Sequence, residues 1–70
     1  MNNKIRSLMV RYFNCNPTDV ATNTTLIALG AQEWQIIEMA MEFESVFGVS
    51  MDAEKALSLK KVSDWENLII

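Results

Sequence analysis

The sequence predicts a small all-α protein built as one domain. A chain of 70 residues has room for a single hydrophobic core, so positions 1–70 are assigned to one domain. Half of the residues are hydrophobic, and the chain contains two glycines and one proline. This composition favours a helical bundle over a turn-rich sheet protein or a disordered chain. Apolar residues recur at helical spacing in the first, middle and last parts of the chain.

The first predicted helix covers about residues 3 to 14. Its apolar residues fall on one helical face: Ile5, Leu8, Met9, Tyr12 and Phe13. Asn2 or Asn3 can cap its start, because a short polar side chain accepts hydrogen bonds from the first free backbone amides. Pro17 ends the pattern, since proline has no amide hydrogen and disfavours helix in the residue before it.

A long connection runs from Pro17 to Ala31 and is rich in Thr, Asn and Asp. Its isolated apolar residues, which we expect to anchor it, are Val20, Leu26, Ile27 and Leu29. Long connections in compact domains are usually functional or held by such anchors. We expect Leu26 and Leu29 to fill part of the core.

The second predicted helix, about Gln32 to Phe47, has two apolar faces. The face expected to point to the core holds Ile36, Met39, Ala40, Phe43 and Phe47. The opposite face holds Trp34, Ile37 and Met41, flanked by Glu38, Glu42 and Ser45. An apolar stripe edged with carboxylates is typical of a partner-binding surface. The alternative interpretation is that the small domain wraps this helix on all sides, or that single apolar side chains are exposed without a role.

Two more helices complete the predicted bundle. A short helix across about residues 51 to 56 has Ser50 as its cap. The last helix covers about residues 61 to 69, and its buried residues are expected to be Val62, Trp65, Leu68 and Ile69. Its start is ambiguous, because Ser63 to Glu66 resembles a capping box although Val62 already fits the core pattern.

The charge distribution points to a protein partner. Six Lys and Arg residues against nine Asp and Glu residues give a net charge of −3. No basic residue lies between Arg11 and Lys55, but that interval holds Asp19, Glu33, Glu38, Glu42, Glu44, Asp52 and Glu54. Such an anionic field repels phosphate backbones and attracts basic surfaces. We expect a partner with a basic or apolar patch, and no nucleic acid.

The residue types exclude the usual catalytic chemistry. The chain has no histidine, which removes the common nucleophile–base pairs and the commonest metal ligand. A single cysteine, Cys15, cannot form an internal disulfide, and no stretch has the length of a membrane span or the pattern of a signal peptide. We predict a cytoplasmic protein that is not an enzyme, has no metal site and does not associate with membranes.

The order of these features resembles the acyl carrier protein family over nearly the whole chain. The resemblance rests on an amphipathic first helix, a long loop with the motif Thr25-Leu26-x-x-Leu29-Gly30, an acidic second helix and a short third helix before a fourth. It implies a small four-helix bundle with three longer helices, one short helix and a long loop between the first two. In that family an Asp-Ser-Leu triplet follows the Leu-Gly pair, and its serine carries a phosphopantetheine arm.

In this chain Gln32, Glu33 and Trp34 occupy the positions of that triplet. Glu33 has no hydroxyl to receive the arm, so we expect no phosphopantetheine and no other cofactor. Both neighbours also differ from the family, which favours natural divergence over a single engineered replacement. A carboxylate in the first helical turn stabilises a helix by about 0.3 to 1 kcal/mol. A further hypothesis is that it imitates the charge of the missing phosphate.

In the family, basic patches on partner enzymes recognise helix two, and Ile37, Glu38 and Met41 match its recognition positions. The predicted partner-binding residues are therefore Glu33, Trp34, Ile37, Glu38 and Met41. The leading hypothesis is an acyl-carrier-like binding module, monomeric or weakly dimeric, that has lost its arm and docks helix two onto one protein.

Two alternatives remain open at this point. One is a small acidic inhibitor, such as an immunity protein that neutralises a basic toxin or enzyme. The other is an acyl carrier that holds its group elsewhere, for example as a thioester on Cys15. A neighbouring toxin gene favours the inhibitor, and neighbouring biosynthetic genes favour the carrier relative.

Overall fold

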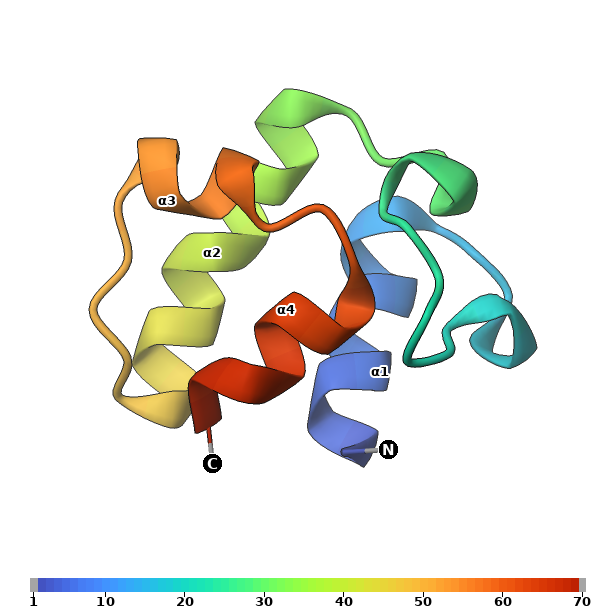
Figure 1. Ribbon diagram of the computed structural model, residues 1–70, viewed down its shortest axis with the longest axis horizontal. Helices are drawn as coiled ribbons and strands as arrows, with labels where there is room; N and C mark the ends of the chain where they lie inside the picture. The colour runs from blue at the N-terminus through green and yellow to red at the C-terminus, as the bar shows by residue number, and fades with distance from the viewer. Residues whose placement is uncertain (1, 70) are drawn as a thin grey trace.

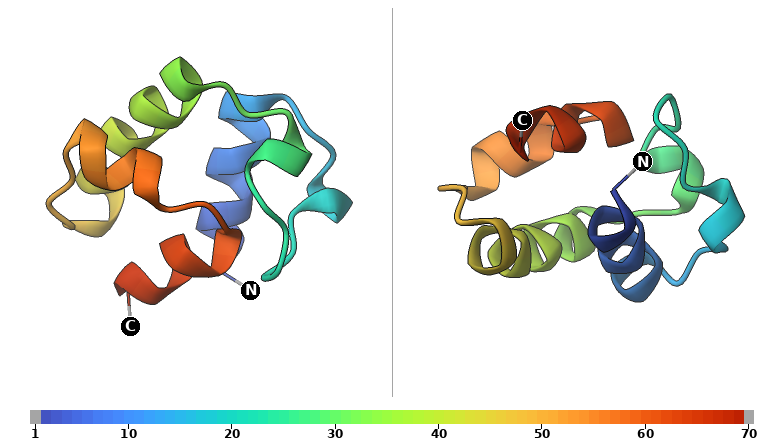
Figure 2. Two further views of the ribbon diagram at one scale, coloured as in Figure 1. Left: turned by 45° about the horizontal axis from the view of Figure 1, so that its top comes forward. Right: turned by 90° about the horizontal axis from the view of Figure 1, so that it is seen from below.

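The computed structural model describes residues 2–69 and confirms the predicted all-α class. Its helices are α1 (Asn3–Phe13), α2 (Glu33–Phe47), α3 (Ala53–Ser58) and α4 (Val62–Glu66). The 3-10 turns are η1 (Pro17–Asp19), η2 (Ile27–Leu29) and η3 (Asn67–Ile69), and η3 extends α4. The helices are labelled in Figure 1. The right panel of Figure 2 shows α3 and α4 on one side of the domain, with α1 and α2 on the other.

The helix α1 begins as the sequence predicts. The side-chain oxygen of Asn2 accepts hydrogen bonds from the backbone amides of Lys4 at 2.8 Å and Ile5 at 3.3 Å, so Asn2 is the cap. The helix ends at Asn14, which has a left-handed backbone with φ of 54° and donates its amide to the carbonyl of Val10. Asparagine tolerates this conformation better than most residues.

The start of α3 differs from the prediction. The helix covers Ala53–Ser58 rather than residues 51 to 56, and Asp52 caps it in place of Ser50. Asp52 has an extended backbone, and its carboxylate accepts a hydrogen bond from the amide of Lys55 at 2.8 Å. Ser50 was a wrong choice because two polar residues precede this helix and local propensity does not distinguish which of them takes the cap conformation.

The structure also shows where α4 begins, which the sequence left ambiguous. The helix begins at Val62, and the carboxylate of Asp64 accepts a hydrogen bond from the amide of Lys61 at 3.0 Å. Of the two possibilities that the sequence left open, the structure therefore supports the one in which Val62 belongs to the helix, and not a capping box from Ser63 to Glu66. Ser63 lies inside the first turn, and its amide donates to the carbonyl of Thr22 at 2.9 Å.

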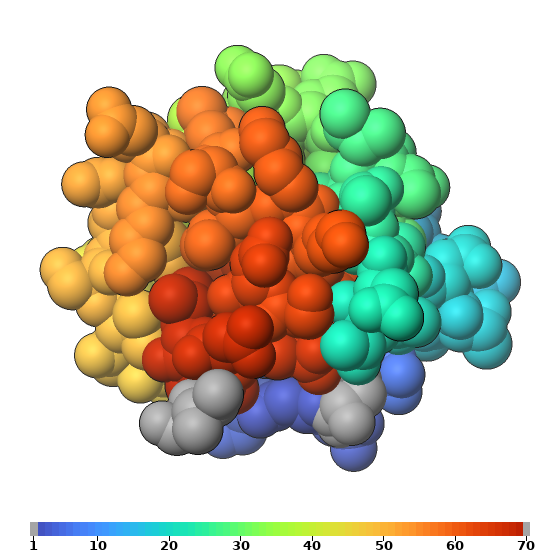
Figure 3. Space-filling view, viewed as in Figure 1, coloured from blue at the N-terminus to red at the C-terminus, as the bar shows by residue number. Residues whose placement is uncertain are grey.

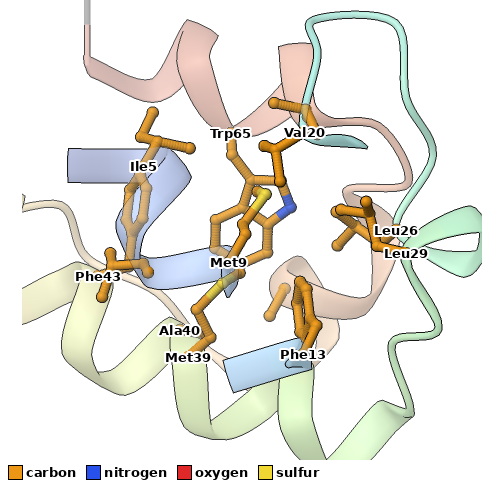
Figure 4. Close-up of a cluster of buried hydrophobic side chains, with 13 residues drawn as sticks. Ile5, Met9, Phe13, Val20, Leu26, Leu29, Met39, Ala40, Phe43 and Trp65 are labelled. Atoms are coloured by element: carbon orange, nitrogen blue, oxygen red, sulfur yellow. The ribbon is translucent and has the colours of Figure 1, made fainter. Parts of the chain in front are cut away.

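The core takes side chains from all four helices and from the long connection (Figure 4). Its buried hydrophobic residues are Ile5, Leu8, Met9, Phe13, Val20, Leu26, Leu29, Met39, Ala40, Phe43, Ala56, Val62 and Trp65. Trp65 packs edge-on against Phe43, with ring centroids 5.1 Å apart, and its indole nitrogen donates to the carbonyl of Leu59 at 3.2 Å. The largest buried side chain thus has a partner for its polar atom.

Several residues expected in the core lie at its edge instead. They are half-buried and pack against the buried cluster: Tyr12, Ile36, Phe47, Leu68 and Ile69. A domain of this size has too little interior to enclose every apolar side chain, so part of each helical face remains at the perimeter.

The long connection is fixed to the segment that joins α3 to α4. Leu26 and Leu29 are buried, as predicted. The amide of Leu26 donates to the carbonyl of Lys60, and the amide of Val62 donates to the carbonyl of Thr24, both at 2.9 Å. The two segments lie side by side in Figure 3, where the connection is green and the α3–α4 segment is orange to red. These backbone bonds fix the connection just before α2 begins.

Candidate partner-binding surface

Local polar groups define the start of α2. Gly30 has a positive φ of 80° and ends η2 by donating its amide to the carbonyl of Ile27 at 2.9 Å. The backbone is extended at Gln32, whose amide donates to the side-chain oxygen of Gln35 at 2.8 Å. The side-chain oxygen of Gln32 accepts the indole N–H of Trp34 at 2.9 Å. This last bond holds the tryptophan ring on the surface at the first turn of α2.

Glu33 is the first residue of α2, and its side chain is exposed. Its carboxylate lies at the positive end of the helix dipole, which stabilises the helix start. Within residues 2–69 it makes no ion pair with a basic side chain. Its negative charge is therefore available at the junction between η2 and α2.

Trp34, Ile37 and Met41 lie on the side of α2 that faces away from the core, and we name them the outward stripe. Trp34 is 58% exposed and Met41 is 68% exposed, whereas Ile37 is half-buried. In the right panel of Figure 2, α3 and α4 lie above α2 and leave its lower side uncovered. Glu38 is also exposed within this segment. The structure thus places the five residues singled out in the sequence along the exposed side of one helix.

Glu42, which the sequence places beside the stripe, contacts two side chains of α1. The hydroxyl of Tyr12 donates to one of its oxygens at 2.6 Å, and Arg11 forms an ion pair with the other at 2.9 Å. The hydrogen bond to Glu42 raises the pKa of Tyr12 above its usual value, and burial and the nearby negative charge add to this effect. Because Arg11 offsets the charge of Glu42, the carboxylates beside the stripe that form no ion pair within residues 2–69 are those of Glu33 and Glu38.

Ile27 is exposed instead of anchoring the long connection. It is 83% exposed, and that expectation was therefore wrong. A 3-10 turn has three residues per turn, so Leu26 and Leu29 share one side and Ile27 must point elsewhere. The exposed side chain of Val46, at 43%, was also not predicted as part of a surface. A prediction of a 3-10 turn at residues 26 to 29 would have placed the side chain of Ile27 on the surface.

A groove of about 540 Å³ lies beside the start of α2. Leu26, Ile27 and Ile36 form one part of its lining, and Leu57 and Leu59 form another. Glu33 and Lys60 also line it, so one acidic and one basic residue accompany the apolar lining. The groove joins segments that no sequence pattern connects.

Cys15 lies apart from this surface, in the turn after α1. Its side chain is half-buried, and its thiol donates to the carbonyl of Met9 at 3.7 Å. Burial raises the pKa of the thiol, so the reactive thiolate is disfavoured. This environment gives little support to the alternative in which Cys15 carries a thioester.

Comparisons with known proteins do not assign the chain to a family: no family model matches it, and a search of curated proteins returns no match. Within residues 2–69, the Cys, Asp and Glu side chains do not come together in threes to hold a metal ion. In the same range, no helix combines the length and apolar character needed to cross a bilayer.

Proposed function

We propose that this protein is a non-catalytic binding module of acyl-carrier-protein type, which docks the outward stripe of α2 onto a basic and partly apolar surface of a protein partner. The order of the elements supports this proposal: a long connection that contains Leu29 and Gly30 is followed by α2, the short α3 and α4. Glu33 stands where the carrier family has its attachment serine. The proposed role therefore uses the carrier surface without the carrier chemistry.

The exposure of Trp34 and Met41 carries this proposal. Two large apolar side chains of types that are common in interfaces lie open to solvent on one side of one helix. Each exposed group loses contact with water when a partner covers it, which stabilises the complex by about 25 cal/mol per Å² of apolar area. Trp34 is also oriented by its bond to Gln32, so less rotational freedom is lost on binding.

The charges beside the stripe define the partner's chemistry. Glu33 and Glu38 are exposed and free of ion pairs within the described chain. Basic groups on a partner would pair with them and accelerate association. A second copy of this chain would instead bring like charges together, which favours a different protein as the occupant.

Binding of a defined peptide tests this function. The probe is a short helical peptide with leucines along one side and arginines along the edges, and the control peptide has glutamates in place of the arginines. We expect the arginine peptide to bind and to shift the backbone amide signals of residues 33 to 41. Trp34→Ala and Met41→Glu should weaken binding by about tenfold or more, equivalent to about 1.4 kcal/mol. Calorimetry measures the affinities.

Val46→Glu is the matched control, since it adds the same charge to an exposed position of α2 that lines a different groove, next to Leu8 of α1. The stripe substitutions should change the free energy of unfolding by less than about 1 kcal/mol. Phe43→Ala, which empties a buried ring position, should cost about 3 to 5 kcal/mol. Unchanged affinity of Met41→Glu, or a loss of stability as large as that of Phe43→Ala, would contradict the proposal.

A further inference from the structure

The methionines within residues 2–69 differ sharply in their environments. Met9 and Met39 are fully buried in the core, at 0% exposure (Figure 4), and Met51 is half-buried. Met41 is 68% exposed and belongs to the outward stripe. The four thioethers are chemically alike, so access to solvent separates their reactivity toward a dissolved oxidant.

Peroxide oxidises a thioether in one balanced step. A sulfur lone pair attacks one peroxide oxygen, the O–O bond breaks, and the sulfur becomes a sulfoxide while the second oxygen leaves as water with both hydrogens. Sulfur loses two electrons and hydrogen peroxide gains them. The apolar side chain becomes a polar one, and methionine sulfoxide reductases reverse the change.

We propose that Met41 is a peroxide-sensitive modification site, and that its sulfoxide weakens docking through the outward stripe; the second part rests on the function proposed above. The sulfoxide oxygen would lie on the stripe near Tyr12, Glu38 and Glu42, with which Met41 lines a shallow depression of about 260 Å³. A partner that covers Met41 would have to remove water from this new polar group. The core would be unaffected, because the Met41 side chain points away from it.

Cys15 carries the one thiol of the chain, and its environment disfavours oxidation. Its thiol is half-buried and hydrogen-bonded to a carbonyl, which leaves little thiolate for attack on peroxide. A Cys15→Ser variant removes this thiol from the experiment without touching the stripe. It is therefore the background for the tests below.

The first measurement is the order of oxidation. The folded Cys15→Ser protein is treated with limiting hydrogen peroxide, and peptide mass mapping follows Met9, Met39, Met41 and Met51. We expect Met41 to gain oxygen first and Met9 and Met39 last. In guanidinium chloride the four should react at similar rates, because burial no longer separates them. Equal rates in the folded protein, or faster reaction at Met51, would overturn the assignment of Met41.

The second measurement is docking by the singly oxidised protein. Its affinity for the arginine peptide should fall by about tenfold and return after treatment with methionine sulfoxide reductases, while its melting temperature is unchanged. In Met41→Leu, the affinity before and after peroxide should be equal. Undiminished affinity of the Met41 sulfoxide would overturn the proposed effect on docking. Failure of the untreated protein to bind the peptide would instead refute the proposed function. The order of oxidation would still test whether Met41 is the modification site.

Discussion

At residue scale, the decisive side chain is Glu33. It opens α2, is exposed, and stands at the position where the acyl carrier resemblance places a serine hydroxyl. A carboxylate can stabilise the helix dipole there but cannot attack the pyrophosphate of coenzyme A. The same junction holds Trp34 on the surface through its bond to Gln32. Under the proposed function, a position for covalent chemistry in the carrier family would serve this protein as a charged contact position.

The absence of a hydroxyl at Glu33 predicts that this protein cannot receive a phosphopantetheine arm. Incubation with coenzyme A and a broad-specificity phosphopantetheinyl transferase should leave the mass of the protein unchanged, because the nucleophilic hydroxyl is absent. The triple variant Gln32→Asp, Glu33→Ser and Trp34→Leu restores the family triplet and should gain the mass of one arm. Intact-protein mass spectrometry compares the two. A gain of that mass by the unmodified sequence would refute both the prediction and the proposed loss of the carrier function.

At element scale, the short helix α3 depends on its cap. It has six residues, and isolated helices of that length are unstable in water. Asp52 satisfies the amide of Lys55, and only Ala56 of this helix is fully buried. Its stability therefore comes from one cap and limited packing, while it supplies Leu57 to the groove beside α2.

The cap of α3 can be tested with two neighbouring substitutions. Asp52→Ala should lower the free energy of unfolding by about 0.5 to 2 kcal/mol, since it leaves a backbone amide without its acceptor. Ser50→Ala should change it by less than about 0.5 kcal/mol, because Ser50 is exposed and outside the cap. Chemical denaturation measures both. A larger loss from Ser50→Ala than from Asp52→Ala would show that Ser50 caps the helix after all.

At the scale of the whole molecule, Glu42 joins α1 to α2. Tyr12 and Arg11 reach it from α1 across a sequence separation of 30 and 31 residues. The contact binds the two helices at the surface, and it also removes one free charge from the edge of the outward stripe. The same three side chains therefore join α1 to α2 and reduce the negative charge of the candidate surface.

The hydrogen bond between Tyr12 and Glu42 makes a prediction about the pH at which Tyr12 ionises. The raised pKa of Tyr12 means that the folded state favours the neutral phenol. The contribution of the Tyr12–Glu42 hydrogen bond to the free energy of unfolding is fully present below the pKa of tyrosine in the unfolded chain, about 10. That contribution is lost as pH rises through the higher pKa of the folded protein. Tyr12 is the only tyrosine, so near-ultraviolet absorbance follows its ionisation directly.

Glu42→Gln should lower the pKa of Tyr12 toward its usual value, because the carboxylate that opposes ionisation is gone. Glu54→Gln, on the exposed side of α3, removes an equal charge elsewhere and should leave the titration close to that of the unmodified protein. Tyr12→Phe should flatten the decrease of unfolding free energy above pH 10. An unchanged tyrosine titration in Glu42→Gln would contradict the hydrogen bond.

Local sequence patterns were enough to predict the helical class and the approximate positions of the four helices, and the residue type at Glu33 was enough to exclude a hydroxyl there. These properties depend on composition and on residues within one or two helical turns, so local patterns contain them. The same patterns placed Trp34 and Met41 opposite the core face of α2, and their exposure agrees with that placement.

Which side chains are exposed, and which carboxylates within residues 2–69 form no ion pair, depends instead on packing between distant segments. Ile27 does not anchor the connection because η2 directs it away from Leu26 and Leu29, and the carboxylate of Glu42 is paired with Arg11 and Tyr12 of α1. The groove beside Glu33 forms where the long connection, α2 and the segment after α3 meet. Contacts between distant segments depend on the packing of the whole chain, and that information is not contained in any local stretch.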